Sequence, residues 1–161
     1  MKAVIENQPH TLSEVNKTML NYSFVISIAY VAVFAIAKIF NLEDVVELSF
    51  TNYILLFIIA YSALKRIYFL NGKKIEYLPG FGKTFLICAL GSLWYCILFF
   101  IYLHIDKKFA ELLVNQFPGG LLYPIVSITG VLFVEGLAMS AIVALALMQI
   151  FKKKDGRWAR E

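Results

Sequence analysis

The sequence predicts an all-α integral membrane protein, a four-helix bundle with a short external interfacial helix between spans 3 and 4. Hydrophobic residues make up 60% of the 161 residues and charged residues 16%, against roughly 25% charged residues in average soluble proteins. The charges cluster between four apolar stretches, each long enough to cross a bilayer, which takes about 20 helical residues. These stretches are apolar nearly all round, whereas a soluble bundle keeps a polar face on each helix. We therefore predict a single domain over residues 1–161, with spans at about 22–40, 49–67, 84–104 and 123–151.

The first span follows a polar segment of 21 residues. Because this segment is polar and the apolar run after it is too long for a signal-peptide core, we expect no cleaved signal sequence. Thr11-Leu12-Ser13-Glu14 has the pattern of a capping box, so helix 1 is predicted to begin near Thr11. Within the span, small and weakly polar residues recur at helical spacing and predict an inward stripe. The stripe consists of Ser23, Ser27, Tyr30, Phe34 and Lys38.

The second span, 49–67, leads into a basic connection with two turn signals, Asn71-Gly72 and Pro79-Gly80-Phe81-Gly82. Glycine and proline in such groups mark turns, so we expect a hinge before helix 3. Basic residues here either determine topology only or also bind anionic lipid headgroups. These residues are Lys65, Arg66, Lys73, Lys74 and Lys83.

The third span, 84–104, carries a second inward stripe. The residues of this span that are expected to face lipid are Leu86, Leu90, Leu93, Ile97 and Phe100. Cys88 and Cys96 are eight residues apart on this helix, about 12 Å along the axis, so they cannot form a disulfide with each other. The stripe consists of Thr84, Cys88, Gly91, Ser92, Tyr95 and Tyr102.

The external connection, residues 104–120, predicts a short amphipathic helix. Asp106 is placed to cap it, and Pro118-Gly119-Gly120 stops it. Its apolar residues share one face, which is typical of a helix lying at a membrane interface. Such a helix is either a connector for spans 3 and 4 or a docking surface for a partner outside the membrane. The apolar face consists of Phe109, Leu112, Leu113 and Phe117.

The last span, 123–151, contains a ridge of small residues that predicts a close contact with another helix, formed by Gly136, Ser140 and Ala144. It also contains Glu135, a carboxylate in the middle of an apolar stretch. Such a group costs several kcal/mol in a bilayer and usually faces the bundle interior, a partner or an ion path.

Glu135 is therefore the centre of a candidate intramembrane polar site. Counting residues from the outer ends of the spans places Tyr30, Ser92 and Tyr95 at a depth comparable with that of Glu135. Tyr61 and Ser62 also fall near this depth by the same count. Lys38 is the candidate counter-charge, although its ammonium group would equally well extend to the outer interface.

Orientation follows from the distribution of basic residues. Four spans place twelve of the fifteen Lys and Arg side chains on the side of the two termini and only Lys38, Lys107 and Lys108 on the other. The positive-inside rule then puts both termini in the cytoplasm. The net charge of +4 is explained by this topology, and because no nucleic-acid-binding motif accompanies it, we expect no nucleic-acid partner.

Two segments carry a resemblance to a known family. Gly80-Phe81-Gly82-Lys83-Thr84-Phe85 opens the third span and Tyr102-Leu103-His104-Ile105-Asp106 ends it, and a glutamate in the last span and a Lys-rich tail complete the pattern. In these features the chain resembles a family of small four-span bacterial inner-membrane proteins classed as a domain of unknown function. The resemblance implies a bacterial cytoplasmic-membrane location and no assigned reaction, and it transfers no catalytic residues.

No catalytic, metal-binding, cofactor or nucleotide motif is apparent in the sequence. We therefore expect a non-enzymatic accessory or assembly subunit, with the lipid bilayer and either a membrane-protein partner or a second copy of the chain around it. The alternative is a small oligomeric transporter, channel or lipid translocase that uses Glu135 as a proton or cation site. An integral-membrane enzyme has the weakest case, because it would need a cluster of His, Asp or Glu residues.

Overall fold

The computed structural model describes residues 8–40, 47–71, 75–116 and 124–158, and this part of the chain folds into five helices. Four of them contain segments long and apolar enough to cross a membrane, at Leu12–Ile39, Phe50–Leu70, Tyr77–Ile105 and Pro124–Phe151. The predicted all-α class and the four long apolar helices are confirmed, as expected for a multi-pass membrane protein. The helices are α1 (Gln8–Ile39), α2 (Glu47–Leu70), α3 (Tyr77–Ile105), α4 (Lys107–Gln116) and α5 (Pro124–Trp158).

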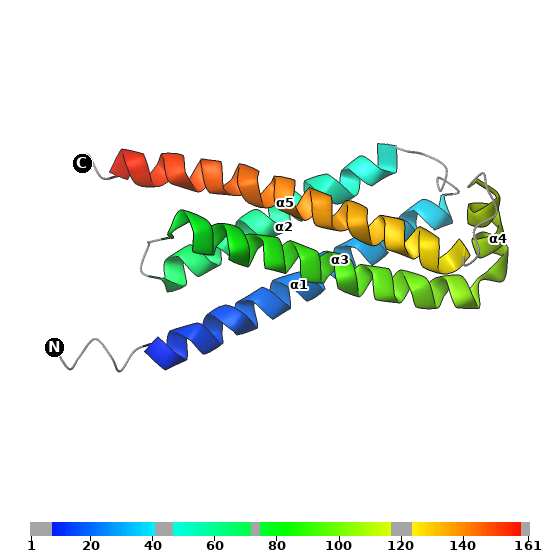
Figure 1. Ribbon diagram of the computed structural model, residues 1–161, viewed down its shortest axis with the longest axis horizontal. Helices are drawn as coiled ribbons and strands as arrows, with labels where there is room; N and C mark the ends of the chain where they lie inside the picture. The colour runs from blue at the N-terminus through cyan, green and yellow to red at the C-terminus, as the bar shows by residue number, and fades with distance from the viewer. Residues whose placement is uncertain (1–7, 41–46, 72–74, 117–123, 159–161) are drawn as a thin grey trace.

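The four long helices run side by side, and α4 lies across one end of them (Figure 1). The first turn of α1 and the last turn of α5 lie at the opposite end. α3 packs against every other helix, most extensively against α5 and α1, and α2 packs against α1, α3 and α5. Figure 1 also shows that α2 stops short of the α4 end, which α3 and α5 reach.

The start of α3 differs from the expected hinge. Pro79 and Gly80 lie within the first turn of the helix, which begins at Tyr77. Proline is tolerated there because the first amide groups of a helix have no intrahelical acceptor. The amide of Gly80 already donates to the carbonyl of Glu76 at 2.9 Å. The prediction of a turn at 79–82 is therefore wrong, and the helix is about two turns longer than the predicted span.

The start of α1 also differs, because the helix begins at Gln8 and not near Thr11. Pro9 then falls in the first turn, where its missing amide costs nothing. Thr11 lies inside the helix, so the capping-box prediction is wrong at this position. Where a helix begins in a polar segment depends on several weak local preferences, of which this pattern is one.

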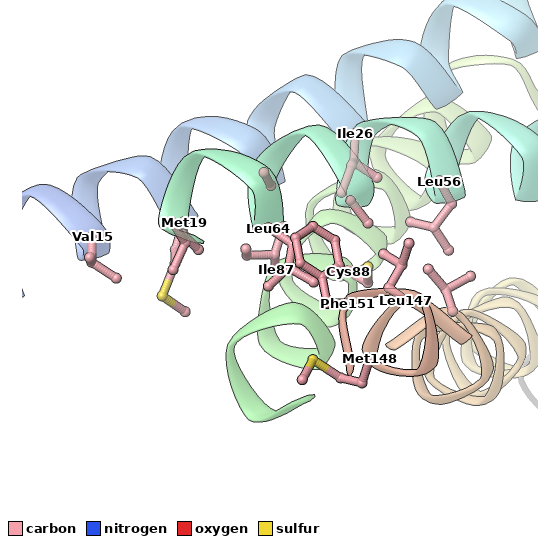
Figure 2. Close-up of a cluster of buried hydrophobic side chains, with 14 of the residues drawn as sticks. Val15, Met19, Ile26, Leu56, Leu64, Ile87, Cys88, Leu147, Met148 and Phe151 are labelled. Atoms are coloured by element: carbon pink, nitrogen blue, oxygen red, sulfur yellow. The ribbon is translucent and has the colours of Figure 1, made fainter. Parts of the chain in front are cut away.

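The interior has two apolar clusters, and the larger one occupies the end of the bundle away from α4. Figure 2 shows side chains of this cluster converging from all four long helices, among them Ile26, Leu64, Ile87 and Leu147. The smaller cluster joins α3, α4 and α5 around Phe99, Leu103, Phe109, Ala110 and Ile128. Tyr95 packs against both clusters and so marks their junction.

The two predicted inward stripes are confirmed. On α1, Ser23 and Ser27 are buried, and the hydroxyl of Ser23 donates to the carbonyl of Ile87 on α3 at 3.1 Å. On α3, Thr84, Cys88 and Ser92 are buried, whereas Leu86, Leu93 and Ile97 are exposed. Small and hydroxyl-bearing residues let the helix backbones approach closely where apolar burial alone gives little drive, as in a bilayer.

The small residues of α5 lie against α3. Ser140 and Ala144 are fully buried. A Cβ atom added at Gly136 would come within 2.8 Å of the Cβ atom of Ser92. Gly91 on α3 meets α1 in the same way, since an added Cβ atom would lie 2.7 Å from the Cγ2 atom of Ile26 and 3.2 Å from the carbonyl oxygen of Ser23. Central α3 is thus held by glycine contacts on both sides.

α4 begins as predicted, because the amide of Phe109 donates to the Asp106 carboxylate at 3.2 Å. Its buried face differs from the predicted one. Phe109 and Ala110 are buried, but Leu112 is 61% exposed, and Phe117 lies outside the described residues. The helix packs against the ends of α3 and α5. Its first turn, with Phe109 and Ala110, is therefore buried, because this turn faces the two longer helices.

Candidate intramembrane polar site

A small cavity of about 70 Å³ lies among the four long helices, near the junction of the two apolar clusters. Four residues predicted for the polar site line it: Tyr30, Ser92, Tyr95 and Glu135. Asn52 and Tyr53 of α2 join them. The rest of the lining is formed by Cys96, Leu132, Gly136 and Met139.

Glu135 lies at the rim of this cavity and accepts a hydrogen bond from the hydroxyl of Tyr53. Its side chain is exposed in the single chain, which corrects the expectation of a buried acid. It shares this outer face of α5 with Val131, Ala138 and Ile142, which are also exposed. A carboxylate within an apolar span is therefore open to whatever surrounds the bundle.

The depth of the site follows from the pairing of Tyr53 with Glu135. At 1.5 Å per residue, Glu135 lies about 16 Å from Pro124, the first residue of α5, but Tyr53 lies only about 9 Å from Glu47, the first residue of α2. The two side chains meet because α2 stops short of the α4 end of the bundle (Figure 1). The site is consequently less than two helical turns below the end of its shortest wall.

Two oxygen atoms of the lining residues have no partner. The Oδ1 atom of Asn52 and the Oγ atom of Ser92 are buried without a hydrogen bond. Five other hydroxyls on these helices bond to the carbonyl four residues earlier, as is usual for Ser and Thr inside helices, whereas the Oγ atom of Ser27, outside the cavity, is also buried without a hydrogen bond. Ser92 departs from this pattern. The hydroxyls that follow it are those of Ser23, Ser62, Thr84, Thr129 and Ser140.

Lys38 does not belong to this site. Its ammonium group pairs with the carboxylate of Asp106 and donates to the hydroxyl of Tyr102. It also lies 4.6 Å from the centre of the Tyr102 ring and 5.4 Å from that of Phe109, within the range of cation–π attraction. The proposed pairing of Lys38 with Glu135 is therefore wrong.

Asp106 connects three helices at this end of the bundle. It pairs with Lys38 of α1, accepts a hydrogen bond from Tyr102 of α3 at 2.8 Å, and caps α4 through the amide of Phe109. The hydrogen bond from Lys38 is the main reason why the pKa of Asp106 lies below its ordinary value of 3.8, and the Phe109 amide contributes to the same shift. The Lys38–Asp106 pair thus fastens α4 to α1 and α3.

Asn52 and Tyr53 are the members that sequence analysis missed. The predicted span 2 begins at residue 49, which places both residues at the membrane surface, and the same count places Tyr61 and Ser62 at the depth of Glu135 instead. In the structure Ser62 is exposed and bonds to the carbonyl of Ile58. An asparagine just inside an apolar span was the available signal, because an amide there needs partners.

Three of the five basic residues proposed to bind lipid headgroups are described, and they lie at the end of the bundle opposite α4. Lys65 and Arg66 are exposed near the end of α2, and Lys83 is half-buried in the first turns of α3. Lys73 and Lys74 lie outside the described residues. No cluster of three or more His, Cys, Asp or Glu side chains suited to a metal ion occurs in the described part of the chain.

Comparison of this chain with protein-family models, curated proteins and solved structures finds no match. What indicates its function is therefore the geometry of its own residues.

Proposed function

We propose that this chain is a non-enzymatic accessory or assembly subunit of a membrane complex, seated in the bacterial cytoplasmic membrane with both termini in the cytoplasm. The observation that carries the proposal is the exposure of Glu135 within an apolar span. A carboxylate facing lipid costs several kcal/mol. A neighbouring helix that covers the site and donates a hydrogen bond removes much of that cost.

The surroundings of Glu135 suit such a contact. Ala138 lies almost one turn further along the same exposed face, so a second helix can approach the backbone of α5 closely there. Val131 and Ile142 are large apolar residues on either side, 55% and 57% exposed. A partner helix with one polar side chain at the level of Glu135 would match this surface.

The size of this cavity argues for a binding or packing role of the residues around Glu135 and against a reaction on an organic substrate among them. Pockets for organic ligands usually measure about 300–1,000 Å³, several times the 70 Å³ between Glu135 and Ser92. Location and orientation rest on the basic residues that cluster on the side of the termini and on the resemblance to a bacterial inner-membrane family.

The contact can be tested with a photo-crosslinking amino acid placed at Ala138, beside Glu135, and at Ile97, which is exposed on α3. We expect a discrete adduct with one membrane protein from position 138 and only diffuse products from position 97. The identified partner, co-expressed with this chain, should co-purify with the wild type and not with Glu135→Lys. Equal crosslinking from both positions, or unchanged co-purification of Glu135→Lys, would refute the proposed contact surface.

The second candidate function is a small oligomeric transporter, channel or lipid translocase. The observation in its favour is the pair of unpartnered oxygen atoms behind Glu135, which can act as ligands.

A further inference from the structure

We propose that the cavity behind Glu135 binds one alkali-metal cation, Na⁺ or K⁺. The carboxylate of Glu135, the Oδ1 atom of Asn52 and the Oγ atom of Ser92 are the primary ligands. Tyr30 and Tyr95 line the same cavity, and their hydroxyl groups would complete the set. Cation binding goes beyond the proposed subunit role and does not depend on it, because the ligands all come from one chain.

Two buried oxygen atoms at the cavity have no hydrogen-bond partner. Ser92 is 2% exposed, and its Oγ atom and the Oδ1 atom of Asn52 are buried without a hydrogen bond. Burying polar atoms without partners is unfavourable, so such groups in native proteins usually have a bound partner or a ligand role. Asn52 and Ser92 line the same cavity as Glu135, and a cation bound there would give all three oxygen-bearing side chains a partner.

The chemistry of the lining favours a hard monovalent cation. Oxygen ligands from carboxylates, amides and hydroxyls suit hard cations, whereas zinc and copper favour nitrogen and sulfur. Glu135 is the one carboxylate among the described residues of the lining, and no Lys, Arg or His belongs to it. The single negative charge of the Glu135 carboxylate balances the charge of one monovalent cation, and no basic side chain competes with the cation for this carboxylate.

Size and position are consistent with this ligand. The cavity measures about 70 Å³, far less than the roughly 300–1,000 Å³ of pockets for organic ligands, and so suits a small inorganic cation with bound water. The rim residues Glu135 and Tyr53 are exposed and half-exposed respectively. They lie less than two turns below the end of α2, the shortest wall. A cation therefore reaches the ligands without crossing the full depth of the bundle.

The test uses the full-length chain purified in detergent. Thermal unfolding is followed in sodium, potassium or choline chloride at one ionic strength, and retention of radioactive sodium is measured in parallel. Binding to the folded state raises the unfolding temperature in a saturable way. We expect such a rise with Na⁺ or K⁺ and none with choline, whose ion is too large for the cavity.

The variants are Glu135→Gln, Asn52→Ala and Ser92→Ala, with Glu14→Gln as the matched control. Glu14 is an exposed carboxylate on α1 and lies outside the cavity. Each cavity variant should fold in choline chloride and lose affinity for the cation about tenfold or more, which removes the shift in unfolding temperature. Glu14→Gln should behave as the wild type.

Equal unfolding temperatures of the wild type in sodium, potassium and choline chloride would overturn the proposal. A cation effect that persists in full in Glu135→Gln would overturn it as well. Loss of partner crosslinking with intact cation binding would contradict only the proposed subunit role, so the two proposals fail separately.

Discussion

Glu135 accepts a hydrogen bond from Tyr53, and a glutamine at this position would still offer a carbonyl oxygen to the same hydroxyl. We therefore predict that Glu135→Gln changes the free energy of unfolding by less than about 1 kcal/mol, the usual net value of one hydrogen bond. Chemical denaturation in mixed micelles containing choline chloride measures this quantity. A large loss of stability would mean that the ionised carboxylate itself holds α5 against α2.

Lys38 and Glu135 have separate partners, Asp106 with Tyr102 in one case and Tyr53 in the other. We therefore predict that the effects of Lys38→Met and Glu135→Gln on stability are additive within about 0.5 kcal/mol, as is usual for independent sites. A double-mutant cycle measures the coupling. A coupling free energy well above this value would indicate that the two side chains do pair directly.

Asp106 should make stability depend on pH in the acid range. Its pKa is lowered in the folded state, mainly by the hydrogen bond from Lys38, so folding favours the ionised form. The stabilisation is fully present above the ordinary value of 3.8 and is lost as the pH falls through the lower folded value. We predict that the unfolding temperature of the wild type falls more steeply below pH 4 than that of Asp106→Asn. Parallel curves for the two proteins would contradict this role.

At the scale of helices, the contact between α3 and α5 depends on Gly136. An alanine there would place its Cβ atom 2.8 Å from the Cβ atom of Ser92, whereas Gly130 of the same helix has open space around it. We predict that Gly136→Ala destabilises the protein by about 1–3 kcal/mol, the usual cost of overpacking. Gly130→Ala is the matched control and should be neutral or slightly stabilising, because alanine favours helix more than glycine does.

Unfolding of both variants in detergent tests this contact. Equal stability of Gly136→Ala and Gly130→Ala would show that α3 and α5 do not approach as closely as the structure has them. Gly91→Ala should resemble Gly136→Ala, since its Cβ atom would meet the side chain of Ile26 and the backbone of Ser23. A backbone atom cannot give way as a flexible side chain can.

At the scale of the molecule, the number of spans and the basic asymmetry predict that both termini are cytoplasmic. Single cysteines at Lys74, Lys108 and Lys154 test this prediction in intact cells. Native Cys88 and Cys96 are buried, so they contribute little background. An impermeant maleimide should label position 108 and leave positions 74 and 154 unlabelled. Labelling at position 74 from outside the cell would show that the orientation is the opposite of the predicted one.

Local patterns along the chain were enough to predict four apolar helices, the two inward stripes and the cap at Asp106. The length of an apolar helix can be compared with the thickness of a bilayer for each helix separately. The same is true of small residues that recur every three or four positions along one helix. The Asp106 cap likewise involves only residues within one turn. These features follow from the sequence alone because they need no knowledge of how the helices are placed against each other.

Which side chains meet was decided only by the tertiary structure. Counting residues from predicted ends assumes that all helices start at the same level, but α2 stops short of the α4 end (Figure 1). This offset brings Tyr53, and not Tyr61 or Ser62, to Glu135. Where α4 packs against the ends of the long helices, Lys38 pairs with the carboxylate of Asp106 and not with that of Glu135. Offsets of one or two helical turns and the position of a short helix arise from packing among several helices, and no single stretch of sequence specifies them.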